Sequence, residues 1–344
     1  MPWPTDEWPE GPVPDGVALE PLLEAVMDPD GPLARTRAVV VVHRGRLVAE
    51  RYGDRTDVWG EVTGAPIDAT TPLLSWSMAK SMLHAVVGML VAEGRLDLDA
   101  PAPVPEWDDP GDPRRAITLQ QLLEMRDGLD FAEDYAPDDE GGSGVSHVIE
   151  MLFGEGVDDV AGYGARRPLA HEPGSTFNYS SGTSNVISGV IRRELGGAEP
   201  YRRFLHERLF DPIGMRSADP RFDDAGTWVA SSYVWATARD MARFGTLYLR
   251  DGVWDGQRLL PEGWVDHARR HRSVDPVDGR LYGAQWWVTG DEHGSFWANG
   301  YEGQSILVCP GQDLVVVRLG KSTIDQYPAL LCWRADVVAA FAGG

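Results

Sequence analysis

The pattern of apolar and polar positions places strands at both ends of the chain and helices between them. Residues 37–43 form an apolar, β-branched run, 44–46 a polar turn and 47–52 a returning run, which together predict an antiparallel hairpin. Near the other end, apolar stretches separated by glycine-containing turns predict strands at 283–289, 295–298, 305–308 and 314–319. Apolar residues at helical spacing predict helices at 17–27, 77–94, 119–125, 145–153, 183–195, 199–210, 237–250 and 327–341, and a weaker pattern is consistent with one more at 261–270.

This order of elements predicts an α/β (α+β) fold in which both termini contribute to one antiparallel sheet flanked by helices. Residues 1–75 and 271–344 would form the sheet domain, and residues 76–270 a mostly helical domain inserted into it. The proline-rich residues 1–15 are expected to form an extended arm on the surface. An active site would then lie between the sheet and the inserted helices.

Composition narrows the class of protein. The chain has 344 residues, of which 43% are hydrophobic and 24% charged, so it has enough apolar residues for a sizeable core. A formal net charge of −22 argues against nucleic-acid and anionic-membrane partners. Two cysteines exclude a disulfide framework and a cysteine-based metal site. There is no apolar run long enough to span a membrane and no signal-peptide pattern, so we expect a cytoplasmic protein.

The strongest chemical signal is a serine followed three residues later by a lysine. A helix that starts near residue 75 or 76 brings Ser77 and Lys80 together on one face. Ser77 would lie in the first turn, where free backbone N–H groups favour a developing oxyanion. Burial and the positive helix end would both favour the neutral form of Lys80. The pattern therefore predicts a base beside its nucleophile.

Two kinds of alternative compete with this interpretation. Lys80 could be an ordinary surface lysine at a helix start, or the chain could use another catalytic apparatus, such as a nucleophile elbow or a metal site. The chain has only two lysines, Lys80 and Lys321, among 31 basic residues, and arginine cannot act as the base. No serine has the flanking glycines of a nucleophile elbow, and the histidines show no metal-binding spacing. No glycine-rich loop matches a nucleotide-binding fingerprint. We therefore expect a reaction that needs neither a metal ion nor an organic cofactor.

The chain carries three short motifs in order: Ser77-Met78-Ala79-Lys80, Tyr179-Ser180-Ser181 after a Pro-Gly-x-x-Phe sequence, and Ala298-Asn299-Gly300. Their order and spacing resemble those of the class C β-lactamase-related serine hydrolases, which include esterases, D-amino-acid peptidases and β-lactamases. Within that superfamily, the segment around Ser77 and the segment 297–304 are most similar to the 6-aminohexanoate-dimer hydrolase-like branch. The resemblance runs from about residue 37 to the C-terminus.

The resemblance implies a role for each motif. Ser77 would attack a carbonyl carbon and form an acyl-enzyme, and Lys80 would take the serine proton. Tyr179 would share the proton transfers, although a tyrosine between two helices is more often part of the core. The backbone N–H groups of Ser77 and Tyr301 would form the oxyanion hole. The residues expected to contact substrate are Tyr135, for which an ordinary loop aromatic is an equal alternative, together with Ser181, Asn299 and Gly300.

Departures from the pattern bear on the substrate. β-Lactamases usually carry Lys or His at the start of the third motif, where this chain has Ala298, and Asn at the end of the second, where it has Ser181. We therefore expect hydrolysis of a small-molecule ester or amide, of the carboxylesterase or 6-aminohexanoate-oligomer type, ahead of β-lactamase or D-amino-acid peptidase activity. A hypothesis of another class is a catalytically silent binding protein on the same scaffold. A homo-oligomer is compatible with the sequence.

Overall fold

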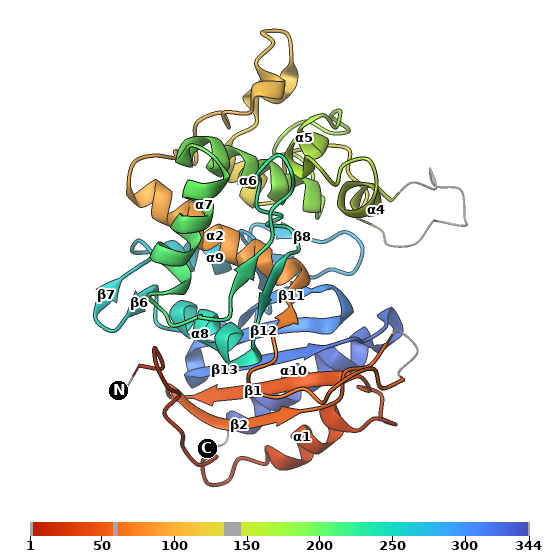
Figure 1. Ribbon diagram of the computed structural model, residues 1–344, viewed down its shortest axis with the longest axis vertical. Coiled ribbons are helices and arrows are strands. Elements are labelled where there is room, and N and C mark those ends of the chain that lie inside the picture. Colours follow the sequence, from red (N-terminus) through yellow and green to blue (C-terminus); the bar gives the residue numbers. More distant parts are fainter. Residues whose placement is uncertain (1–2, 58–60, 134–145, 343–344) are drawn as a thin grey trace.

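The computed structural model describes residues 3–57, 61–133 and 146–342, and Figure 1 shows a broad sheet below a group of helices. The helices are α1 (Glu20–Met27), α2 (Ala79–Ala92), α3 (Leu119–Leu123), α4 (His147–Phe153), α5 (Val160–Ala165), α6 (Ser181–Leu195), α7 (Ala198–Phe204), α8 (Ala238–Leu249), α9 (Trp264–Arg269) and α10 (Tyr327–Phe341). The longer strands are β1 (Thr36–His43), β2 (Arg46–Tyr52), β11 (Phe296–Gly300), β12 (Gln304–Cys309) and β13 (Leu314–Gly320). The short strands are β3 (Leu73–Leu74), β4 (Asp219–Pro220), β5 (Val234–Ala236), β6 (Val253–Trp254), β7 (Gln257–Arg258), β8 (Ser273–Val274), β9 (Leu281–Tyr282) and β10 (Trp287–Val288).

One eight-stranded antiparallel sheet unites the two ends of the chain. Its strand order is β2-β1-β13-β12-β11-β10-β9-β8, so the C-terminal strand β13 lies directly beside the N-terminal strand β1. The hairpin of β1 and β2 forms at the predicted position. The predicted fold class is therefore confirmed: an antiparallel sheet is built from both termini and flanked by helices.

Helices cover both faces of this sheet, which explains why its central strands are almost continuously apolar. Side chains alternate along β1, and Val40 and Val42 pack in the core that contains α2 and α8. Val39 and Val41 point the other way, into the core formed with α1 and α10. All four valines are fully buried. The sheet is thus the middle layer between two helical layers (Figure 1).

The helices between the two halves of the sheet form the upper part of the molecule in Figure 1, where α4, α5, α6 and α7 are grouped. Helix α2 runs beneath them and contacts α6, and α8 packs on β1, β12 and β13. Gly245 of α8 allows the helix to lie this close to the sheet, because a Cβ at this position would clash with a Val315 methyl group at 2.7 Å. The division of the chain into domains at residues 75/76 and 270/271 stays a prediction.

Several elements differ locally from the predicted ones. The first helix begins at Glu20 rather than residue 17, with Pro21 in its first turn, where proline is tolerated. The strand expected at 283–289 shrinks to β10, since Gln285 adopts a left-handed φ of 57°. The helix expected at 199–210 changes at Leu205 from α7 into a π-helical turn. The arm at the N-terminus packs on α8, where Arg243 donates to the carbonyl of Pro4.

Within the described residues, no helix is both long enough and apolar enough to cross a membrane.

Candidate active site

Ser77 lies in a 3₁₀ turn, Trp76–Met78, that leads from β3 directly into α2. The turn is held by Ser75, whose backbone N–H donates to Val234 O at 2.9 Å and whose Oγ accepts from Val234 N at 3.1 Å. Trp76 adopts a left-handed φ of 45°, a conformation that costs energy for a residue with a side chain. The strained turn presents Ser77 at the start of the helix, as the sequence predicts.

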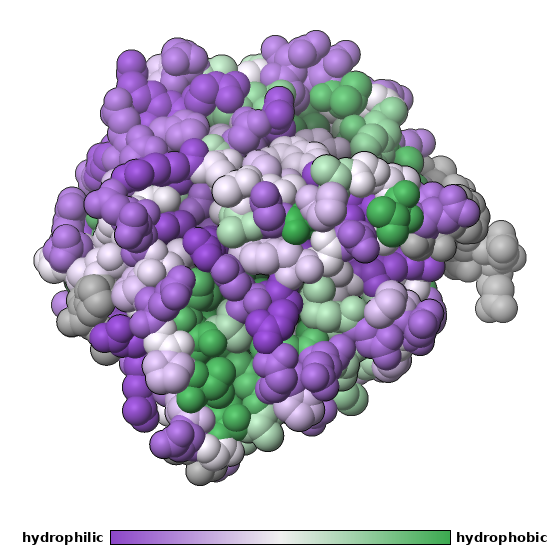
Figure 2. Space-filling model, turned by 60° about the horizontal axis from the view of Figure 1, so that its bottom comes forward, coloured by the Kyte–Doolittle hydropathy of each residue, from purple (hydrophilic) through white to green (hydrophobic). Residues whose placement is uncertain are grey.

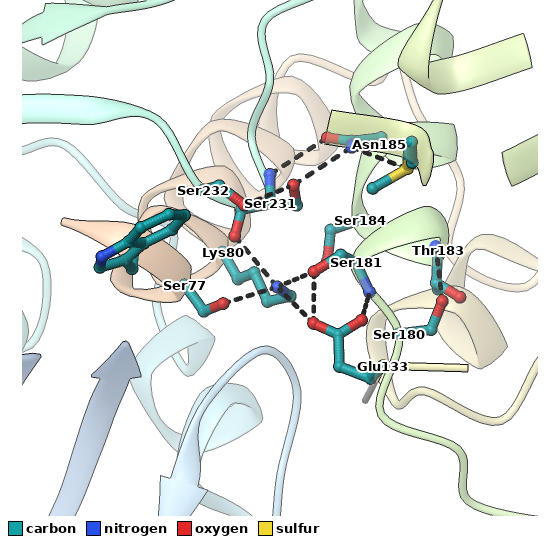
Figure 3. A network of polar contacts seen from close by, with 12 residues as sticks. Ser77, Lys80, Glu133, Ser180, Ser181, Thr183, Ser184, Asn185, Ser231 and Ser232 are labelled. Atoms are coloured by element: carbon teal, nitrogen blue, oxygen red, sulfur yellow. Dashed lines mark hydrogen bonds and ion pairs between the residues drawn. The ribbon is translucent and has the colours of Figure 1, made fainter. Parts of the chain in front are cut away.

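Lys80 is the centre of the polar network around Ser77 (Figure 3). Its ammonium group donates to Ser77 Oγ at 3.0 Å, to Ser181 Oγ at 2.9 Å and to the carbonyl oxygen of Ser231 at 3.0 Å. The side chain is only 2% exposed. The predicted pair of Ser77 and Lys80 on one helix face is therefore present in the structure, and the alternative of a surface lysine is wrong.

Burial sets the protonation of Lys80. Desolvation lowers the pKa of its ammonium group to about 8, while the nearby Glu133 carboxylate raises it. The Glu133 Oε1 atom lies 4.0 Å from Lys80 Nζ. With a pKa near 8, a useful fraction of Lys80 is neutral at neutral pH, and a small rise in pH increases that fraction. The group is thus able to accept a proton from a hydroxyl in contact with it.

Glu133 also holds the start of α6, which begins at Ser181, the last residue of the second motif. Its carboxylate accepts from the backbone N–H of Ser181 at 2.7 Å and from Ser181 Oγ at 2.5 Å. Ser180 caps the same helix by accepting from Thr183 N at 3.0 Å. A carboxylate at a helix N-terminus is favoured by the free N–H groups there. Glu133, Ser181 and Lys80 therefore form one connected cluster next to Ser77.

Tyr179 lies just before α6, with its ring against Lys80. The ring centre is 4.9 Å from Lys80 Nζ, and the ring packs on Trp287 and Tyr282. Burial raises the pKa of the Tyr179 phenol well above its usual value, and a hydrogen bond with Ser77 opposes that shift. The phenol is therefore neutral at ordinary pH and holds a proton beside the Ser77 hydroxyl.

The third motif occupies the end of β11, next to the turn that carries Ser77. A Cβ on Gly300 would lie 2.4 Å from Ser75 O, so only glycine allows the strand to approach this closely. The following residue, Tyr301, places its ring edge-on against Trp76 at 5.5 Å. Asn299 makes a different contact, because its Nδ2 donates to the hydroxyl of Tyr327 at 2.8 Å.

The structure brings together most, but not all, of the residues expected at the site. Lys80 bonds to both Ser77 and Ser181, the Tyr179 ring packs on Lys80, and Gly300 adjoins the turn that carries Ser77. The side chain of Asn299 is engaged by α10, and Tyr135 lies outside the described residues.

Sequence reasoning missed Glu133 and the carbonyl of Ser231. Neither belongs to a spaced motif, and Lys80 and Ser231 are 151 residues apart. Across the described residues, no group of three or more His, Cys, Asp or Glu side chains is arranged to hold a metal ion.

The fold and its serine–lysine pair define a β-lactamase/transpeptidase-like protein. The chain belongs to the beta-lactamase family, whose model matches residues 33–340. The 6-aminohexanoate-dimer hydrolase of Paenarthrobacter ureafaciens is 28% identical over 317 residues, which cover 83% of this chain and 72% of that protein. Esterase EstB of Burkholderia gladioli is 27% identical over 260 residues, or 72% of this chain and 61% of the esterase.

Among solved structures, a Bacillus anthracis protein described as a 6-aminohexanoate-dimer hydrolase superposes with a TM-score of 0.77 at 23% identity. The superposition covers 98% of this chain and 88% of that one, which shows a common fold. The predicted resemblance to this superfamily and to its 6-aminohexanoate-dimer hydrolase-like branch is confirmed.

Proposed function

We propose that the protein is a serine hydrolase that cleaves a small ester or amide through an acyl-Ser77 intermediate. The observation that carries the proposal is the contact between Lys80 Nζ and Ser77 Oγ at 3.0 Å, made by a buried lysine whose pKa is lowered to about 8. A nucleophile and a base within hydrogen-bond reach are the minimum apparatus of covalent catalysis.

In the proposed acylation step, Ser77 Oγ attacks the substrate carbonyl carbon while Lys80 Nζ takes the hydroxyl proton. The oxyanion would be stabilised by the backbone N–H groups of Ser77 and Tyr301, each contributing about 10²- to 10³-fold in rate. The Tyr179 phenol, which is neutral because burial raises its pKa, donates its proton to the leaving oxygen or nitrogen. The carbonyl–leaving-group bond then breaks, and the Lys80 ammonium returns a proton to Tyr179.

Deacylation would use the same pair of groups. Lys80, now neutral again, takes a proton from the water molecule that attacks the acyl carbon and then passes it to Ser77 Oγ, while the Tyr179 phenol stays protonated. The bond to Ser77 Oγ breaks, the serine regains its proton, and the carboxylic acid leaves. No step requires a metal ion or an organic cofactor.

The relatives and the third motif support an ester or amide substrate ahead of a β-lactam. One curated relative is named a 6-aminohexanoate-dimer hydrolase and another an esterase. The position where β-lactamases carry Lys or His is filled by Ala298, which is 1% exposed and part of the apolar core. A charged group for a β-lactam carboxylate is therefore absent from that position. β-Lactamase and D-amino-acid peptidase activity remain the second candidate within the same chemistry.

The decisive experiment is labelling with a fluorophosphonate probe, followed by intact mass and peptide mapping. A serine activated by Lys80 is expected to displace fluoride and carry the phosphonyl group on the peptide that contains Ser77. The Ser77→Ala variant should not be labelled, and Lys80→Met should be labelled at least about a hundredfold more slowly, because general-base catalysis typically contributes 10²–10⁴-fold.

The matched control is Ser175→Ala, which removes an exposed serine elsewhere and should be labelled like the wild type. Thermal unfolding of each variant shows whether the fold is retained. If the wild type takes up no probe while a control esterase does, the catalytically silent binding protein is the better description. Labelling at another residue would contradict the assignment of Ser77.

A further inference from the structure

A cavity of about 350 Å³ lies on the other face of the sheet, between α10, strands β11 and β12, and the loop that joins β10 to β11. Figure 2 turns the bottom of the molecule towards the viewer and shows apolar residues gathered in a hollow on this side. The lining includes Trp297, Leu307, Leu331, Arg334, Val338 and Ala339. None of the proposed catalytic groups belongs to it, so the cavity is a separate feature.

The walls of this cavity are chiefly apolar. The α10 residues that line it recur at helical spacing, so one face of the helix forms a wall along its length. Leu331 and Ala339 remain exposed there, while Val338 is buried. A volume of this size is within the range of sites that bind small molecules. The shape and the lining suit a short alkyl chain.

Arg334 supplies the polar end of the cavity. It is only 9% exposed, and its guanidinium stacks on the Trp297 ring at 4.7 Å while Nη1 donates to Ser305 Oγ at 3.1 Å. Within the described ranges, no carboxylate lies within ion-pair distance of it. Burial lowers the pKa of this arginine to about 10, and the nearby charge of Arg280 lowers it as well. A buried cation without a counter-charge is costly, and an anionic ligand relieves that cost.

A second buried donor lies in the same wall. The indole N–H of Trp297 has no hydrogen-bond partner among the described residues, although the atom is shielded from solvent. The acidic residue that lines the cavity, Asp291, is already engaged, because its Oδ1 accepts from the backbone N–H groups of His293 and Ser295.

We propose that this cavity binds a linear alkyl monocarboxylate, with the carboxylate at Arg334 and the chain along α10. Arginine and carboxylate match in charge and geometry, since two parallel N–H···O bonds can form. The apolar walls bury the alkyl chain, which supplies most of the affinity through the hydrophobic effect. The site is independent of the proposed catalytic function and needs no reaction at Ser77.

Isothermal titration calorimetry with sodium octanoate tests the proposal, with octan-1-ol as the neutral ligand of equal chain length. The wild type is expected to bind octanoate at one saturable site, about tenfold or more tightly than the alcohol, because charge-assisted hydrogen bonds add to chain burial. Arg334→Met should lose that preference. Absence of saturable binding, or equal affinity for the alcohol, would overturn the proposal.

Because Arg334 is buried, its replacement can disturb the fold, and a second variant locates the site independently. Ala339→Phe adds a ring to an exposed helix position in the cavity lining and is expected to abolish octanoate binding. Cys332→Phe adds the same ring to an exposed position of α10 outside the lining and should bind octanoate like the wild type. Octanoate binding that survives Ala339→Phe places the ligand elsewhere and refutes the assignment.

Discussion

At the scale of single residues, Glu133 gives the proposed mechanism a measurable electrostatic signature. Its carboxylate lies 4.0 Å from Lys80 Nζ and raises the pKa of the lysine, which burial lowers to about 8. Glu133→Gln keeps the shape but removes the negative charge. Since the charged form of Lys80 then loses its partner, we expect its pKa to fall, by about half a unit or more.

The measurement is the pH dependence of fluorophosphonate labelling, or of kcat/KM once an ester substrate is found. The wild-type rate should rise with pH with a midpoint near 8, and the midpoint of Glu133→Gln should lie at lower pH. Glu155→Gln, at an exposed position, is the matched control and should keep the wild-type midpoint. A midpoint that stays in place or moves upward would show that the titrating group is not Lys80.

The candidate site shows how far residue patterns lead. Ser77 and Lys80 were predictable because three residues of helix bring two side chains together, and this relation depends only on local geometry. Glu133 was not predictable, because it reaches Lys80 and Ser181 from a separate segment of the chain and follows no spacing rule. The long-range contacts that set the pKa of the lysine depend on packing, which the sequence alone does not specify.

At the scale of elements, the close approach of β11 to the turn that carries Ser77 makes Gly300 a sharp test. Its φ of −133° is accessible to any residue, so an added Cβ acts through steric contact, with Ser75 O at 2.4 Å and with Gln304 Cβ at 2.9 Å. We expect Gly300→Ala to move the strand away from the turn and displace the Tyr301 N–H from the proposed oxyanion hole. The labelling rate should fall by about 10²- to 10³-fold.

The comparison requires labelling rates and thermal unfolding side by side. A control with little steric consequence is Gly111→Ala, where the nearest atom would lie 3.4 Å away, and it should retain the wild-type rate. If Gly300→Ala reacts with the probe as fast as the wild type while remaining folded, the backbone N–H of Tyr301 does not stabilise the transition state.

Some helices and strands were predictable from the sequence because their residues carry a clear local pattern, and others were not. The valine-rich strand β1, the capping box of Thr118 and Gln121 at α3, and the long helix α10 each carry a repeated or reciprocal signal. Strands β8 and β9 have two residues each, too few for alternation to be visible, and they form only by pairing with their neighbours. Short elements of this kind depend on tertiary contacts rather than local pattern.

At the scale of the whole molecule, a buried histidine pair links stability to pH. His84 Nε2 lies 3.1 Å from His267 Nδ1, and His267 Nε2 lies 2.9 Å from Gln120 Oε1, which joins α2, α9 and α3. Desolvation lowers the pKa of His267 to about 4, with Arg272 and Arg270 adding to the shift, and that of His84 well below its usual value. Both rings are therefore neutral in the folded protein at neutral pH.

The sign of the effect follows from proton binding. Below a pH of about 6.5 the unfolded chain protonates His267 while the folded protein does not, so the free energy of unfolding decreases as the pH falls towards 4. At pH 5 the loss from His267 is at most about 2 kcal/mol. Asp127 acts in the opposite direction, because burial raises its pKa to about 6 and the folded state then binds the extra proton.

Urea unfolding of the wild type and of His267→Gln, measured between about pH 4.5 and 7.5, separates the contribution of His267 from that of Asp127. Since Asp127 is common to both proteins, the difference between their unfolding free energies reports His267 together with its coupling to His84. We expect the variant to lose less stability than the wild type as the pH falls below about 6.5. His171→Gln, at an exposed position, should follow the wild-type curve. Parallel curves for wild type and His267→Gln would mean that the buried pair does not govern the acid sensitivity of the fold.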